Sequence, residues 1–212
     1  DDENLKDYEL SRLARNLARN SIWVPAERIV DLINDKNERL QRLSYIAEKM
    51  AIGGKPDESL SLLRSSLGKE QSRETKIAQV QALNQIVNSF IKCNETSKAI
   101  DNLVILEDEL LKMELINTSQ AERIASTAEL WILLGNLEKA SALFGIAVEI
   151  ANQYLGLYGD KGRMRHEVRQ SYKAIFCLML RNKETDLAST CVKRINDVHE
   201  RELIIDYISE FR

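Results

Sequence analysis

The chain has 212 residues, with 30 Lys and Arg, 33 Asp and Glu, eight Gly and two Pro. Hydrophobic residues make up 44% and charged residues 30%, which is typical of a globular chain and not of a disordered one. So few turn residues exclude an all-β protein, and a net charge of −3 argues against nucleic acid or an acidic membrane as the partner. The longest apolar run, Ala174 to Leu180, is far shorter than the ~20 residues that span a bilayer.

The number of cysteines and the first residues of the chain are informative about the cellular compartment of the protein. Three cysteines cannot form a closed set of disulfides, which predicts free thiols in a reducing, cytoplasmic compartment. The first residues, Asp1 to Asn4, are acidic and lack Met, which is unlike a signal peptide. We expect either a chain from which a leader was removed or a fragment of a longer protein.

Apolar residues recur three and four positions apart along most of the chain. In chain order the clearest stripes run from Leu10 to Leu17, Leu43 to Met50, Val80 to Phe90 and Leu130 to Leu134. This spacing is the signature of amphipathic helices, and no long stretch alternates with period two. An all-α fold is therefore predicted.

Breaks between the stripes come in two kinds. Short breaks rich in Gly and Asn end one helix and turn into an antiparallel neighbour; they fall at 20–21, 53–55, 93–95, 135–136 and 181–183. Longer, more polar links fall at 35–37, 68–75, 117–120, 156–162 and 196–198. In the third of these links, Ser119 and Glu122 have the spacing of a capping box, which predicts the start of a helix. The chain thus alternates helix, tight turn, helix and longer link.

Part of the sequence recurs at an offset of 162 residues. The segments 33–48 and 195–210 share eight of sixteen positions, among them Ile-Asn-Asp at 33–35 and 195–197 and Glu-Arg at 38–39 and 200–201. Four units of about 40 residues fit this offset. A small residue that lets two helices approach to ~8–10 Å marks the start of each second helix. These residues are Ala26, Ser59, Ala99, Ala140 and Ala188.

The pattern resembles the tetratricopeptide repeat (TPR) family. The fourth unit carries the fullest set of matching residues, namely Ala128, Trp131, Gly135, Ala140, Phe144 and Ala147. The repeats are longer than is usual in that family. The resemblance implies a right-handed superhelical solenoid of about five antiparallel helix hairpins plus a final helix, as one domain over 1–212. The expected units are 5–36, 37–70, 71–118, 119–161 and 162–197, with the final helix at 198–212.

The resemblance also implies that the first helices line a concave groove that binds a protein or peptide. The expected groove residues are Arg15, Arg19, Glu48, Asn84, Asn88, Lys92, Glu129, Lys173 and Arg181, with Ser44 and Glu122 beside them. Asn side chains suit a peptide backbone because an amide both donates and accepts. The places where some relatives clamp a C-terminal carboxylate hold Ser11 and Arg15, which argues against that specialised role.

Catalytic and metal-binding patterns are nearly absent. His166 and His199 have no Cys at ligand spacing, and Cys177 and Cys191 read most simply as core thiols. No phosphate-binding glycine motif is present, and the Gly-rich segment 156–162 reads as a link. We expect no cofactor, no metal and no enzymatic activity.

Two basic clusters could anchor acidic or phosphorylated segments, because Arg binds carboxylate and phosphate through two parallel bonds. One is Arg12, Arg15 and Arg19. The other is Arg165, Arg169 and Lys173, preceded by Lys161 and Arg163. The competing interpretation of both clusters is a solvated charged surface, offset by nearby acidic residues such as Glu167.

The leading hypothesis is a non-enzymatic protein–protein interaction module, an adaptor or scaffold. An alternative is a regulatory or sensor segment of a larger multidomain protein. A third is a small-molecule hydrolase or transferase built on an all-α scaffold, which a ligand bound at His166 or Cys177 would support. The final helix carries several apolar residues, which predicts a homo-oligomer contact or a continuing array there. Neither nucleic acid nor a membrane is expected as a partner.

Overall fold

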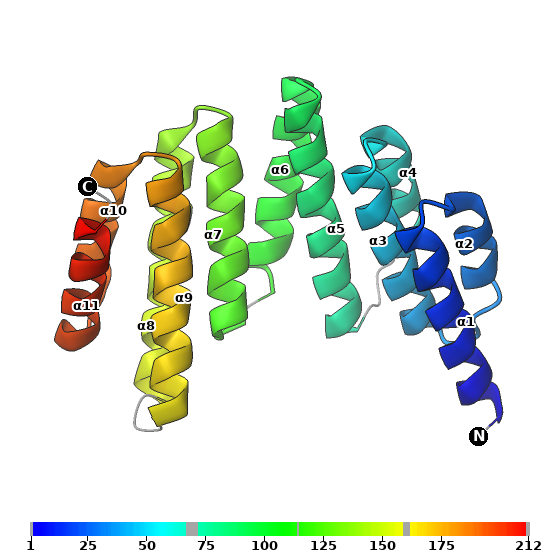
Figure 1. The fold of residues 1–212 in the computed structure, drawn as a ribbon, viewed down its shortest axis with the longest axis horizontal. Helices are drawn as coiled ribbons and strands as arrows, with labels where there is room; N and C mark the ends of the chain where they lie inside the picture. Colours follow the sequence, from blue (N-terminus) through cyan, green and yellow to red (C-terminus); the bar gives the residue numbers. More distant parts are fainter. Residues whose placement is uncertain (1, 67–71, 114, 159–161, 211–212) are drawn as a thin grey trace. The chain divides into compact units, whose positions relative to one another are not determined.

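The computed structural model describes residues 2–66, 72–113, 115–158 and 162–210, which are helices joined by short turns (Figure 1). The predicted all-α fold is confirmed. The described helices are α1 Asp2–Arg19, α2 Trp23–Val30, α3 Lys36–Ile52, α4 Pro56–Ser66, α5 Arg73–Lys92, α6 Thr96–Leu111, α7 Thr118–Leu133, α8 Leu137–Tyr158, α9 Gly162–Arg181, α10 Thr185–Cys191 and α11 Val198–Ser209, with a short 3-10 helix at Val192–Arg194.

The chain divides into two compact units, Asp1–Leu106 and Glu107–Arg212. In unit 1, α1 packs on α2 and α3, and α3 packs on α4 and α5. In unit 2, α7 packs on α8 and α9, and α9 packs on α8, α10 and α11. Within each unit, then, a first helix contacts both its own hairpin partner and the next first helix.

The five predicted tight turns are confirmed, and all have the same geometry. Each places one residue in the left-handed region: Ser21 and Asn94 at φ 60°, Lys183 at 63°, Gly135 at 78° and Gly54 at 80°. In the α7/α8 turn, the Gly135 N–H donates to Ile132 O at 2.8 Å and the Asn136 N–H donates to Trp131 O at 2.9 Å. The corresponding two bonds close the other four turns. This is the Schellman motif, which satisfies carbonyls that a helix end would otherwise leave unpaired.

A small residue follows each turn at a fixed distance. Ala26, Ser59, Ala99, Ala140 and Ala188 each lie five positions after the left-handed residue, and each is 0% exposed. At this position the second helix crosses close to the first, so no room is left for a longer side chain. Ser59 also joins the two helices by a hydrogen bond, because its hydroxyl donates to the Ala47 carbonyl on the preceding helix.

Four first helices start in a common way. A polar side chain before the helix accepts the backbone N–H three residues on: Asp35 from Glu38 at 2.6 Å, Ser72 from Thr75 at 3.2 Å, Asn117 from Gln120 at 2.8 Å and Asp197 from Glu200 at 3.0 Å. The side chain of the second residue in each pair contacts a preceding segment of the chain. Glu38 accepts from the Ser11 hydroxyl at 2.6 Å, and the Gln120 amide donates to Leu110 O at 2.7 Å.

The predicted capping box at Ser119 and Glu122 is wrong. Helix α7 begins at Thr118, and Asn117 is its cap. The Asn117 side chain accepts the Gln120 N–H, so the helix starts before Ser119. Ser119 therefore lies within the first turn of the helix, where it is exposed. Two capping patterns overlap in this link, and the earlier one forms.

The sequence identity between 33–48 and 195–210 has a structural cause. Ile33 and Ile195 are both buried at 1% exposure before a first helix, and Asp35 and Asp197 both cap it. The backbone at this point is held in both units by a side-chain oxygen. In unit 1 the Asp7 carboxylate accepts the Asn34 N–H at 3.0 Å and the Asp35 N–H at 2.8 Å.

In unit 2 an amide takes the equivalent role. Asn152 Oδ1 accepts the Asn196 N–H at 3.1 Å and the Tyr172 hydroxyl at 2.7 Å, while its Nδ2 donates to Arg194 O at 2.7 Å. Tyr172 is fully buried, and burial raises the pKa of its hydroxyl, which therefore stays a donor.

Each unit has its own apolar core. In unit 1, Ala14, Val30, Ile33 and Ile46 form a cluster that joins α1, α2 and α3. In unit 2, the large side chains Phe144, Tyr172 and Phe176 are fully buried, and Trp131 is 3% exposed. The final helix turns Ile204 and Ile208 inward and leaves Ile205 exposed. Phe211, also singled out in the sequence, lies outside the described residues.

Replacing Ala140 by Leu should wedge α7 and α8 apart and destabilise unit 2 by about 1–3 kcal/mol through overpacking. The matched control is Ala142→Leu, two residues away on the exposed side of α8. Urea unfolding of both variants provides the measurement. Equal stability of the two variants would contradict the close helix crossing.

Asp7→Asn should lower the melting temperature at neutral pH. Two backbone N–H donors, at Asn34 and Asp35, hold the pKa of Asp7 below the usual 3.8. A depressed carboxyl pKa stabilises the fold above the unfolded-state pKa, and this contribution is lost as the pH falls through the folded-state value. The gap in melting temperature between wild type and variant should therefore narrow below about pH 4.

The control for Asp7→Asn is Asp101→Asn, at an exposed position of α6. It should leave the melting temperature nearly unchanged across the same pH range. A gap for Asp7→Asn that stays constant from pH 7 to pH 3 would show that the charge of Asp7 does not hold the α3 start.

Candidate functional site

The residues expected to bind a partner lie on first helices in both units. Arg15 and Arg19 are on α1, Glu48 on α3, and Asn84, Asn88 and Lys92 on α5, all in unit 1. Glu129 on α7 and Lys173 and Arg181 on α9 belong to unit 2. In unit 1 these side chains are half-buried or exposed, so the set is open to solvent.

Tyr45, which sequence reasoning missed, links the unit 1 residues on α1 and α3. Arg19 Nε donates to the Tyr45 hydroxyl at 3.0 Å. Lys49 Nζ lies 4.9 Å from the centre of the Tyr45 ring and 2.8 Å from Glu48 Oε1. This row of Arg19, Tyr45, Lys49 and Glu48 fixes two cations and one carboxylate side by side. An aromatic three residues before Glu48, on the same side of the helix, was the sequence signal that could have found it.

The other unit 1 residues have no such partners. Among the described residues, Arg15, Asn84, Asn88 and Lys92 form no side-chain hydrogen bond or ion pair. Asn84 and Asn88 are four residues apart and therefore share one side of α5. Both residues are half-buried, and their amide groups can each donate and accept hydrogen bonds that no side chain or backbone group of the described residues takes up.

The unit 2 residues are already engaged within the chain. Glu129 Oε1 accepts from Arg181 Nε at 3.1 Å and from Asn182 Nδ2 at 2.8 Å, which ties α7 to the end of α9. Lys173 Nζ lies 5.5 Å from the centre of the Tyr207 ring on α11. A ligand that binds these groups must displace internal contacts, which makes unit 1 the better candidate site.

The basic cluster on α9 is neutralised by acidic residues. Arg169 binds Glu200 with two bonds, both 2.8 Å long, and Arg165 lies 3.2 Å from Asp197 and 3.5 Å from Glu200. Arg163 pairs with Glu167 at 3.2 Å, and Lys161 lies outside the described residues. Glu200 is 0% exposed, and its bonds raise the pKa of Arg169. Arg165 and Arg169 therefore attach α11 to α9.

Three further residues considered for binding have other roles. Ser44, expected in the groove, is 0% exposed, and its hydroxyl donates to Leu40 O at 2.9 Å, so that expectation is wrong. Ser11 is buried and bound to Glu38, while Arg12 pairs with Glu9 at 2.7 Å on the surface. Helical spacing placed Ser44 on the right helix but could not tell a groove position from the neighbouring buried one.

The described residues contain no group of three or more His, Cys, Asp or Glu that could hold a metal ion. His166 and His199 are both exposed. Cys191 is buried, and burial raises the pKa of its thiol, as expected of a core cysteine, while Cys177 is half-buried and Cys93 is exposed. Across the described helices, none combines the length and apolar character that crossing a membrane requires.

No protein-family model and no curated protein matches the chain. Among solved structures, the chain is similar to the crystal structure of Ton1535 from Thermococcus onnurineus NA1. The similarity covers 96% of this chain and 79% of that one, with 16% sequence identity and a TM-score of 0.32.

Arg169→Met should cost about 1–3 kcal/mol, because the buried Glu200 carboxylate loses its two-bond partner and keeps only Arg165, 3.5 Å away. The control is Arg163→Met, which removes an exposed ion pair worth about 0–1 kcal/mol. Denaturant unfolding compares the two variants. If Arg169→Met costs no more than Arg163→Met, the α9 cations do not attach α11 and are free to bind a ligand.

Proposed function

We propose that this chain is a non-enzymatic interaction module whose first helices bind a partner polypeptide. In this proposal the hairpins form a right-handed superhelical stack of the tetratricopeptide-repeat type. The support is the common construction of the five hairpins, each with the same turn geometry and a fully buried small residue five positions later. A single hairpin cannot bury its apolar faces, so hairpins of one kind stack on their neighbours.

One observation carries the functional proposal, namely the unpartnered polar residues on α1 and α5. The side-chain amides of Asn84 and Asn88, both half-buried residues, can each donate to and accept from a peptide backbone. Arg15 and Lys92 supply positive charge for acidic side chains. The proposed partner segment is therefore extended and acidic, with backbone amides free to bond.

The Arg19–Tyr45–Lys49–Glu48 row favours the same kind of ligand. Its cations are held in place before binding, which lowers the side-chain entropy lost when a carboxylate binds. The row also holds the Glu48 carboxylate 2.8 Å from Lys49 Nζ, so a ligand of uniform negative charge is disfavoured there. A peptide that mixes acidic and neutral residues fits this arrangement better than a polyanion does.

Comparative affinity capture tests the proposal. The face variant carries Arg15→Glu, Arg19→Glu and Lys92→Glu. The control variant carries Arg28→Glu, Lys55→Glu and Arg64→Glu, which are exposed positions on or beside second helices with the same total change of charge. Proteins captured by both wild type and the control variant should be lost from the face variant.

Binding of the captured protein is then measured by calorimetry. The face variant should bind at least tenfold more weakly than wild type, since it places three like charges against an acidic segment. Equal affinities for wild type and the face variant, with weaker binding by the control variant, would move the site to the second helices and contradict the proposal.

A further inference from the structure

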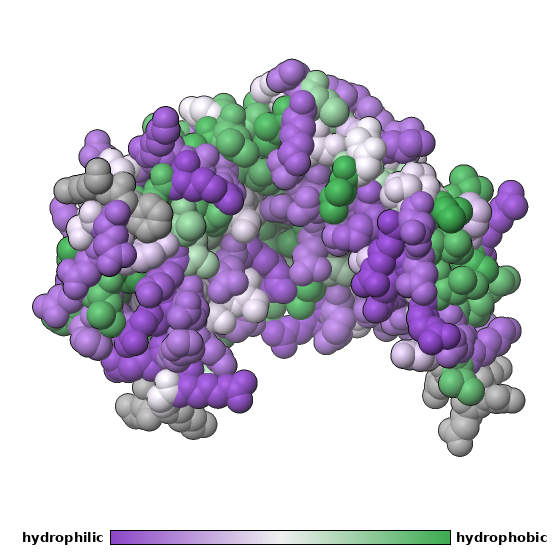
Figure 2. All heavy atoms as spheres, in the orientation of Figure 1, coloured by the Kyte–Doolittle hydropathy of each residue, from purple (hydrophilic) through white to green (hydrophobic). Residues whose placement is uncertain are grey.

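Helix α5 carries a row of uncharged amides on the side that does not face its core. Gln81, Asn84, Gln85 and Asn88 follow one another at helical spacing, and we call these four residues the amide stripe. Gln81 is exposed and the other three are half-buried, whereas the apolar residues between them are buried. Figure 2, in the view of Figure 1, shows hydrophilic side chains over much of α3 and α5.

The side-chain amides of the stripe are not used inside the protein. Within the described ranges of the chain, none of the four has a hydrogen-bond partner. Asn side chains elsewhere bond to their own helix, since Asn20, Asn102 and Asn182 each donate to the carbonyl four residues earlier at 2.8 Å. The amides of the stripe make no such bond, so their donors and acceptors are available to another molecule.

The spacing of the stripe matches the backbone of an extended polypeptide. Residues four apart on a helix are separated by about 6.0 Å along its axis, as in the pairs Gln81 with Gln85 and Asn84 with Asn88. In an extended chain, backbone groups on the same side recur about every 6.6–6.8 Å. A segment that runs along α5 therefore brings a backbone group to an amide at every second residue.

Lys92 continues the row at one end. It lies four positions after Asn88, is exposed, and pairs with no carboxylate of the described chain. The rise from Gln81 to Lys92 is about 16 Å, which about five extended residues span. A bound segment thus places its backbone on the amides and a carboxylate at Lys92. That carboxylate belongs either to an Asp or Glu side chain or to a C-terminus.

Other classes of ligand fit the stripe less well. A partner helix has already bonded its backbone groups internally, so it has none to offer to a row of amides. A nucleic acid needs cations for its phosphates, and the stripe is neutral. Bases and sugars stack on aromatic rings, but the aromatic residue of α5, Phe90, is 0% exposed.

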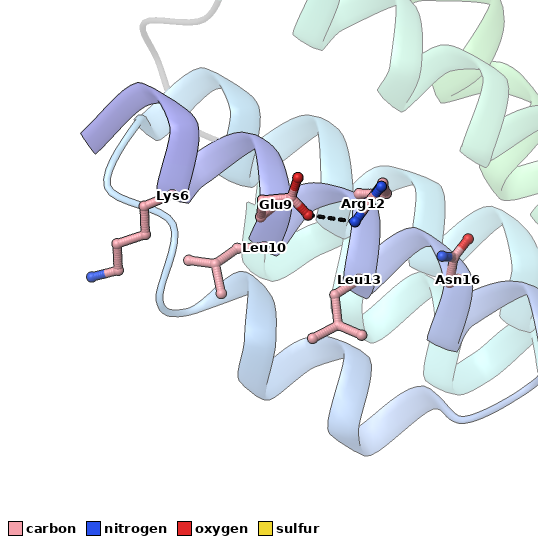
Figure 3. A pocket seen from close by; sticks show the side chains of 6 residues that line it. All are labelled: Lys6, Glu9, Leu10, Arg12, Leu13 and Asn16. Carbon is pink, nitrogen blue, oxygen red and sulfur yellow. Dashed lines mark ion pairs between the residues drawn. The ribbon is translucent and has the colours of Figure 1, made fainter. Parts of the chain in front are cut away.

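The corresponding residues of α1 and α3 are engaged. Arg12 holds the position of Gln85 on α1, nine residues before the left-handed turn residue, and it pairs with Glu9 at 2.7 Å (Figure 3). Tyr45 holds this position on α3, and its hydroxyl accepts from Arg19. Among the first helices of unit 1, then, α5 offers the neutral and unpaired row.

We propose that the amide stripe binds the backbone of an extended partner segment that runs along α5 and places a carboxylate at Lys92. This inference rests on the proposed function. It adds Gln81 and Gln85 to the site, and it gives the direction of the bound segment. Because the amides bond to backbone groups, binding tolerates most side chains along the stripe and selects for the carboxylate at one end.

A library of random ten-residue peptides, displayed on phage with free C-termini, provides the probe. It is selected against the full wild-type chain, and the tightest binder is synthesised for calorimetry. The double variant Gln81→Met with Gln85→Met should bind this peptide at least tenfold more weakly, because a thioether has nearly the size of the amide group but cannot donate. The control Gln153→Met, at an exposed position of α8, should bind like wild type.

Two changes to the peptide test how it is read. N-methylation of one residue at a time should weaken binding at least tenfold at every second position, whereas alanine at those positions should change the affinity little. Amidation of the C-terminus should weaken binding if Lys92 holds a C-terminal carboxylate. Asp→Asn or Glu→Gln in the peptide should do so if it holds a side chain. Lys92→Met should remove the effect in either case.

The possible failures separate this inference from the proposed function. A peptide that loses affinity for the face variant but binds the Gln81→Met, Gln85→Met variant like wild type overturns the amide stripe and leaves the polypeptide site in place. Equal losses from N-methylation and from alanine at the same residues show recognition of side chains and also overturn it. A library from which no peptide is enriched overturns both.

Discussion

The close crossing of two helices just after a left-handed turn residue is the constraint on which the rest of this structure depends. Each of the five turns has one residue at positive φ. Five residues later, the second helix of each hairpin carries a small side chain that is fully buried. The turn geometry and the small residue act together, because the Schellman bonds set the direction in which the second helix leaves. Once that direction is fixed, each hairpin has an apolar face that only another element can bury.

Much of this was predictable from the sequence, because local backbone chemistry has local signals. Gly54, Asn94 and Gly135 predicted the turns in which they lie, and Ala99 and Ala140 predicted the close helix–helix contacts that follow. The start of α7 was less predictable, because both Asn117 and Ser119 are suitable N-cap residues. Only the structure shows that Asn117 is the N-cap. Side-chain pairing across helices was harder still. The burial of Glu200 beneath Arg169 joins residues 31 positions apart, and no spacing rule connects them.

The same limit applied to the candidate site. Helical spacing and the resemblance to tetratricopeptide repeats selected polar residues on first helices, but they could not tell a free side chain from an engaged one. Arg181 and Glu129 hold α7 and α9 together, whereas Asn84 and Asn88 have no side-chain partner among the described residues. The same types of polar residue join helices to one another and bind ligands. The two roles differ only in which side chains lie nearby in the folded structure, and the sequence does not show that directly.

The central claim is that the unpartnered amides of α5 receive the backbone of a partner polypeptide. The side-chain amide signals of Asn84 and Asn88 in a nitrogen–proton correlation spectrum report on this directly. On titration with the captured partner, both signals should shift and saturate together with the backbone signals of α1 and α5. If both stay in place while signals from α2 and α4 move, the partner binds the opposite side of the hairpins and the account is wrong.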